Sequence, residues 1–153
     1  MSAEAPGDGA AASGRRQARR SAIVLLYQRD VLDHEMPDLV DRYERDAGAR
    51  LPDYAGELVD GVLGAQPGLD ETISRLAEGW TLDRVAPLER NVLRVALYEI
   101  EAGSVPPAAA IAEAVAYAKR YASPEAASFV NGILAARARE LGLPQTKKRS
   151  TSS

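Results

Sequence analysis

Four arginines near the start of the chain are the residues whose type and spacing point most directly to chemistry. They lie in one short stretch without any acidic residue, at Arg15, Arg16, Arg19 and Arg20. On a helix they form two like-charged pairs four residues apart, and each pair costs a few tenths of a kcal/mol. Cations in the first turns of a helix also oppose its dipole. Because an external anion would relieve both penalties, the cluster predicts an anion contact.

Tyr27 places an aromatic ring beside this cluster. It follows Arg20 by about two helical turns and falls on nearly the same face. Arginines next to a ring suit single-stranded RNA, since guanidinium groups bind phosphates and a ring can stack on an unpaired base. From the spacing alone, a solvated basic turn with Tyr27 half-buried in the core is the more common arrangement, because short basic turns are frequent in helical proteins.

The remaining polar residues form no catalytic or metal-binding pattern. The chain has no cysteine, which excludes disulfides, thiol nucleophiles and thiolate zinc sites. The only histidine, His34, stands between two acidic residues in a polar loop and is expected to be solvated, as are Asp53, Glu57 and Asp60 on one side of a helix. The sequence shows no nucleophile, base and acid in the order of a catalytic triad, and it shows no glycine-rich loop that could bind phosphate. We therefore expect no enzymatic activity, no metal and no cofactor.

The elements that must position these residues are all expected to be helices. Apolar residues recur at helical spacing, and strand-like alternation is absent. We expect an all-α fold of about seven helices. The first four are expected at 15–31, at 37–47, from 52 to a break at Pro67 and Gly68, and from 69 to Gly79. The last three are expected at 87–102, at 107–122, and from Pro124 onward, with Ser123 as the N-cap. The helix at 87–102 is the most apolar and is expected to be the most buried.

The two ends of the chain differ from this body in composition. Residues 1–13 and 143–153 lack large apolar side chains apart from Met1 and Leu143, so we expect two disordered tails around one helical domain at 14–142. The net charge is -3; the arginine cluster carries +4 and Lys147, Lys148 and Arg149 carry +3, which leaves -10 for the rest. Basic ends on an acidic body indicate a local anionic contact. The apolar stretch after Arg20 is too short for a signal peptide or a membrane span, so a cytoplasmic location is expected.

Two features of the helical body are expected to serve packing. Trp80, the only tryptophan, is predicted to fill a gap between helices. Gly132 stands in mid-helix, where glycine costs up to about 1 kcal/mol relative to alanine. We expect it where another helix approaches closely, with Asn131 bonded to the backbone of that neighbour.

Three blocks of sequence, in the same order and spacing, resemble the NusB family. They are RRQAR leading into AIVLLY from Arg15, RNVLRVALYEI from Arg90, and a third block made of IAEAV, AKRY and FVNGIL from Ile111. The match covers roughly residues 15–141. The resemblance implies a NusB-like fold of about seven helices in two small helical subdomains. One departure is Ala112, where the family usually has Asn.

The resemblance also implies a function and its site residues. NusB-type proteins are expected to bind the boxA sequence of ribosomal RNA leaders together with NusE, a ribosomal protein. The complex, with other Nus factors, acts on elongating RNA polymerase so that it reads through terminators. The implied RNA-binding positions are Arg15, Arg16 and Arg19, to which the charge pattern adds Arg20, together with Tyr27, Glu125 and Phe129. The implied partner-binding positions are Tyr27, Glu89 and the adjacent Arg90.

Three other functions fit parts of the pattern. One is the non-catalytic RNA-binding domain attached to some RNA cytosine methyltransferases, which would need a catalytic domain downstream. Another is a helix-turn-helix DNA-binding protein, which would place its basic residues in a recognition helix after a tight turn. The third is an adaptor that binds protein alone, and salt-dependent RNA binding would distinguish it.

Overall fold

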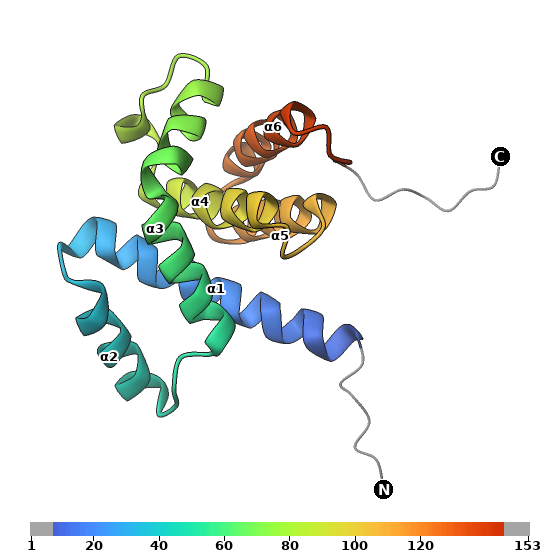
Figure 1. The fold of residues 1–153 in the computed structure, drawn as a ribbon. Helices are drawn as coiled ribbons and strands as arrows, with labels where there is room; N and C mark the ends of the chain where they lie inside the picture. Colours follow the sequence, from blue (N-terminus) through green and yellow to red (C-terminus); the bar gives the residue numbers. More distant parts are fainter. Residues whose placement is uncertain (1–7, 146–153) are drawn as a thin grey trace, which may run out of the picture. The chain divides into compact units, whose positions relative to one another are not determined.

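The computed structural model describes residues 8–145, and within them every regular element is helical. The order is α1 (Asp8–Leu32), α2 (Met36–Ala47), α3 (Asp53–Leu76), the short 3-10 helix η1 (Leu82–Arg84), α4 (Pro87–Ala102), α5 (Pro107–Tyr121) and α6 (Pro124–Glu140), as Figure 1 shows. The predicted all-α fold is therefore confirmed.

The chain divides into two compact units, one ending at Gly61 and the other beginning at Val62, so α3 contributes to both. In the first unit α1 packs against α2, and the hydroxyl groups of Ser21 and Tyr43 are hydrogen-bonded at 2.8 Å. In the second unit α5 and α6 pack on each other and both pack on α4. The two units supply separate candidate surfaces.

α1 begins at Asp8, seven residues before the expected start at Arg15. Residues 8–13 of the expected tail are thus helical, consistent with the high helix propensity of the alanines at 10–12. At the other end, residues 143–145 are irregular. The rest of both expected tails, at 1–7 and 146–153, lies outside the described residues.

The expected break at Pro67 and Gly68 is wrong, because α3 continues through both residues. Proline removes one backbone donor and costs roughly 3 kcal/mol inside a helix. Val62 before the proline and Leu69 and Ile73 after it are almost completely buried. This continuous apolar face stabilises the unbroken helix. Two expected helices are one, and the described residues contain six α-helices instead of seven.

The end of α4 and the starts of α5 and α6 lie where the sequence predicted them. α4 carries nine buried residues and ends at Gly103, whose φ of 71° is the left-handed conformation that glycine adopts readily. Pro107 is the first residue of α5. α6 begins after Ser123, whose Oγ accepts a hydrogen bond of 3.0 Å from the backbone N–H of Ala126. The prediction that α4 is the most buried helix is confirmed.

Candidate nucleic-acid interface

The four arginines of α1 differ in exposure. Arg15 and Arg16 are exposed and Arg20 is half-buried, whereas Arg19 is only 7% exposed. Arg16 and Arg19 both have interactions within the chain, but only Arg16 keeps its side chain at the surface. Because α1 starts at Asp8, all four lie beyond its first turn, where the helix dipole acts weakly. The expected dipole penalty is therefore wrong, and only the repulsion between the like-charged pairs remains.

Helical spacing explains why the cluster is divided in this way. Ala18, Ala22 and Leu25 form a buried face, and Arg19 lies at its edge. On the other side four residues follow one another at intervals of four, four and three, and we call them the α1 stripe: Arg16, Arg20, Val24 and Tyr27.

The α1 stripe combines charge with an exposed ring. Val24 is 39% exposed and Tyr27 is 37% exposed. The phenol ring of Tyr27 is thus open to solvent on the same side of the helix as two arginines. The arrangement can offer guanidinium groups to phosphates and a ring face to a base.

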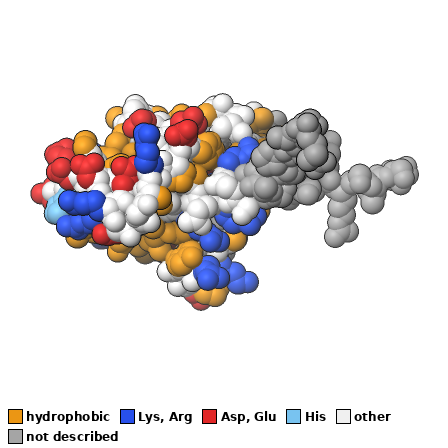
Figure 2. All heavy atoms as spheres, turned by 90° about the horizontal axis from the view of Figure 1, so that it is seen from below, with side chains coloured by type: hydrophobic (Ala, Val, Ile, Leu, Met, Phe, Trp, Pro, Cys, Tyr) orange, Lys and Arg blue, Asp and Glu red, His pale blue; other side chains and the backbone are white. Residues whose placement is uncertain are grey.

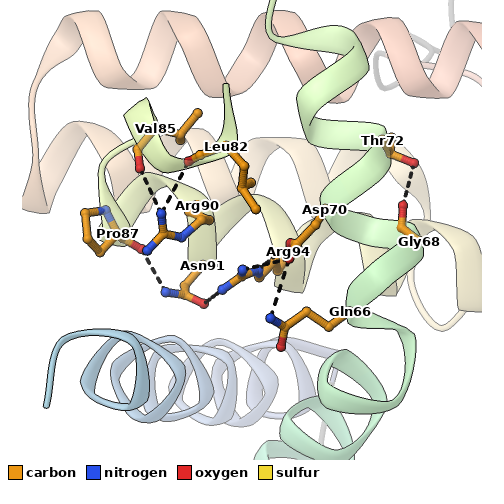
Figure 3. Close-up of polar contacts among 10 residues, drawn as sticks. All are labelled: Gln66, Gly68, Asp70, Thr72, Leu82, Val85, Pro87, Arg90, Asn91 and Arg94. Carbon is orange, nitrogen blue, oxygen red and sulfur yellow. Dashed lines mark hydrogen bonds and ion pairs between the residues drawn. The ribbon is translucent and has the colours of Figure 1, made fainter. Parts of the chain in front are cut away.

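The start of α4 holds Glu89 and Arg90, the expected partner contacts. The Arg90 guanidinium Nη1 donates to the carbonyl oxygens of Leu82 and Val85, both at 3.3 Å, and ties η1 to α4 (Figure 3). Glu89 is half-buried, and this burial raises the pKa of its carboxyl group. Arg90 therefore positions the loop before α4, while Glu89 presents a partly desolvated acid next to it.

A buried polar network fixes α4 against the second half of α3 (Figure 3). The Arg94 guanidinium donates from Nε to Asp70 Oδ1 at 2.7 Å and from Nη2 to Asp70 Oδ2 at 3.0 Å. Its Nη1 donates to Asn91 Oδ1 at 3.0 Å, and Asn91 Nδ2 donates to the Pro87 carbonyl at 2.8 Å. Helical spacing does not predict this network, because it joins residues of two different helices. Its signal was an arginine and an asparagine within the most apolar helix.

A hollow of about 400 Å³, which we call the α6 hollow, lies between the end of α3 with its following loop and one side of α6. Its lining includes Arg75, Trp80, Phe129, Gly132 and Arg139. Phe129, an expected RNA-binding residue, is half-buried there. Glu125, the other expected residue of this helix, is exposed in the first turn of α6.

The packing roles expected for Trp80 and Gly132 are wrong. Trp80 is 53% exposed and lines the α6 hollow instead of filling a gap between helices. A Cβ added at Gly132 would meet nothing within 4 Å, so no neighbouring helix requires a glycine at this position. Asn131 is also exposed. Helical spacing could not reveal these positions, because they depend on where the α3–α4 loop lies.

The single histidine and the acidic side chains of the described residues do not gather into a metal site. His34 is exposed, as expected, and Figure 2 shows the single histidine in pale blue with acidic side chains near it. In the part of the chain that the structure describes, no group of three His, Asp or Glu side chains could hold a metal ion. No helix among residues 8–145 is long and apolar enough to cross a membrane.

Comparison with known proteins relates the chain to one family. The model of the NusB family matches residues 16–139. A transcription antitermination protein NusB from Rubrobacter xylanophilus is 40% identical over 121 residues, which are 78% of this chain and 86% of the relative.

Two solved structures share the fold. The structure of NusB from T. maritima is 32% identical, with a TM-score of 0.74 over 82% of this chain and 91% of that chain. A crystal structure of antitermination factors NusB and NusE in complex with dsRNA matches with a TM-score of 0.76 and 28% identity, over 84% of this chain and 98% of that chain.

Proposed function

The chain belongs to the NusB family, and from this membership we propose that it is a transcription antitermination factor. It binds a boxA-type single-stranded segment in the leader of ribosomal RNA operons together with NusE. With other Nus factors, the complex acts on elongating RNA polymerase so that it reads through terminators. The observation that carries this proposal is the family match along residues 16–139, which spans α2 to α5 and most of α1 and α6.

The proposed RNA contact is centred on α1. Arg15, Arg16 and Arg20 neutralise phosphates, and Tyr27 stacks on a base or orients the partner. Arg19 is buried, so it adds to the positive potential of this surface without an open approach for a phosphate. Phosphate contacts hold the RNA in register but do not read its sequence. Sequence preference must therefore come from the ring of Tyr27, from the second unit or from NusE.

The second unit supplies the other proposed contacts. Glu89 lies beside the turn that Arg90 holds in place, and its partly desolvated carboxylate suits a charge-assisted hydrogen bond from a cationic side chain of NusE. Glu125 and Phe129 on α6 are proposed to lie along the RNA. The protein acts by binding alone, in the cytoplasm, without a cofactor.

The proposal is tested by assembling the complex from purified components. A labelled leader RNA with a boxA-type sequence is titrated with the protein, with and without its cognate NusE, and binding is followed by fluorescence anisotropy. We expect NusE to tighten binding of this RNA but not of an RNA with the same composition in scrambled order. A duplex RNA in a third titration establishes whether single strands are preferred.

Equal binding of the boxA-type and scrambled RNAs in the presence of NusE would contradict the proposed function. Binding of NusE without any RNA binding would indicate an adaptor that acts on protein alone.

A further inference from the structure

The centre of α3 contains a stretch without any fully buried side chain. No residue between Val62 and Leu69 is buried, although the helix is continuous through all of them. In α4, α5 and α6, buried residues recur at intervals of no more than four between the first and the last of them. We call residues 63–68 the α3 middle. The apolar face there consists only of half-buried side chains, so it receives little of the packing on which helices in proteins depend.

The α3 middle is also rich in the residues that favour a helix least. Gly64, Pro67 and Gly68 occupy half of its positions. Glycine and proline have the lowest helix propensities of all residues. Because Pro67 has no backbone N–H, it cannot donate a helix hydrogen bond to the carbonyl oxygen of Leu63. Packing and intrinsic helix propensity are therefore weak at the same place.

The helix is held firmly on both sides of the α3 middle. Val59 is buried before it, and Leu69 is buried after it. The next residue, Asp70, is bonded to Arg94 of α4 (Figure 3). The first compact unit ends at Gly61, directly before the α3 middle. A weak segment between two anchored ones, at the boundary of two units, has the properties of a hinge.

A side-chain hydrogen bond provides the backbone with an alternative partner at the end of the α3 middle. The hydroxyl group of Thr72 donates to the carbonyl oxygen of Gly68 at 3.1 Å (Figure 3). A hydroxyl that bonds back to the carbonyl four residues earlier competes with the helix bond and often bends the helix. The Gly68 carbonyl therefore keeps a donor when its bond from the Thr72 backbone N–H lengthens.

We propose that the α3 middle is a hinge, at which the helix opens reversibly and the two units change orientation while each stays folded. The hinge separates α1, with its arginines, from Glu89 and α6 in the second unit. Each unit can then adjust separately to RNA and NusE in one complex. This consequence rests on the proposed function, whereas the hinge itself is tested in the free protein.

Alanine at the two glycines tests the hinge without disturbing the packing. A Cβ at Gly64 or Gly68 would meet nothing within 4 Å, so Gly64→Ala, Gly68→Ala fits the folded structure. Backbone hydrogen exchange, corrected for intrinsic rates and followed by mass spectrometry, should be faster at residues 64–72 than at 57–62. The double variant should slow it at 64–72 by roughly 20-fold, since each glycine contributes about a factor of five.

Gly56→Ala is the matched control, because it lies in the first half of the same helix and its Cβ also meets nothing within 4 Å. Buried residues lie on both sides of it, at Ala55 and Leu58. This variant should leave hydrogen exchange at residues 64–72 unchanged.

Distances between spin labels test the change of orientation. The chain has no cysteine, so labels can be attached at the exposed positions Arg45→Cys on α2 and Lys119→Cys on α5. Their distance distribution, measured by double electron–electron resonance, should be broad in the parent and narrower with Gly64→Ala, Gly68→Ala. The control pair Ser74→Cys, Lys119→Cys lies within the second unit and should give one narrow distribution in both backgrounds.

Two results would overturn the hinge. One is exchange at residues 64–72 that is as slow as at 57–62, or that Gly56→Ala slows as much as the double variant does, because α3 would then open as a whole. The other is the same distribution of distances between the units in the parent and in the double variant. Neither measurement involves RNA or NusE, so failure of the hinge and failure of the proposed function are distinguished.

Discussion

Removing Asp70 should destabilise the second unit strongly, because it leaves the Arg94 cation buried without its carboxylate. The Arg94 side chain is 5% exposed and that of Asp70 is 19% exposed, and two hydrogen bonds join them. Deleting one partner of a buried ion pair costs about 3–5 kcal/mol. Since Asp70 has some access to water and Asn91 still accepts from Arg94, we expect Asp70→Ala to cost about 3 kcal/mol, the lower end of that range.

Urea unfolding measures this loss, with Trp80 fluorescence reporting on the unit that contains the pair. Glu71→Ala removes an exposed acid at the next position of the same helix and should change the free energy of unfolding by no more than about 0.5 kcal/mol. The double variant Asp70→Leu, Arg94→Met should recover most of the loss, since apolar replacements of a buried pair are often neutral. The reasoning is refuted if Asp70→Ala costs no more than Glu71→Ala.

Three further outcomes follow from single contacts. Gly132→Ala should raise the free energy of unfolding by up to about 1 kcal/mol in urea, because its Cβ meets open space; a decrease would mean that the site is crowded. Ser123→Ala should lower it by about 1 kcal/mol through loss of the bond from Ala126, and an unchanged urea midpoint would argue against the cap. Hydrogen bonding to Arg75 lowers the pKa of Glu140 from 4.5 to about 2, so its contribution is present above pH 4.5 and is lost as the pH falls toward 2. Melting temperatures between those pH values should therefore fall less steeply in Glu140→Gln, and identical slopes would contradict the ion pair.

Local sequence signals predicted those helix ends that depend on local chemistry. The glycine at the end of α4, the prolines at the start of α4 and α5, and the serine before α6 each act on the backbone within a few residues. Pro67 is a local signal of the same kind, and it misled because burial of residues on both sides stabilises a continuous α3. Tertiary burial therefore outweighed a local helix-breaking tendency.

The sequence predicted only part of the candidate site, because local signals carry no information on tertiary burial. The arginine cluster and the ring of Tyr27 follow from residue type and helical spacing, which placed them on α1. The burial of Arg19 and the exposure of Trp80 depend on residues distant in the chain, and no spacing rule contains that information. The pairing of Arg94 with Asp70 joins positions 24 residues apart, so it also required the fold.

The salt dependence of RNA binding by an α1 variant tests the central claim most directly. Arg15→Ala, Arg16→Ala removes two exposed charges from α1, and Arg42→Ala, Arg45→Ala removes two exposed charges from α2 as the control. With about 0.7 per phosphate contact, the α1 double variant should flatten the log-log salt slope of boxA-type RNA binding by about 1.4 and weaken binding at low salt, while the α2 variant keeps the parent slope. If the α1 variant binds with the parent affinity and slope, with or without NusE, the arginines of α1 are not the RNA site.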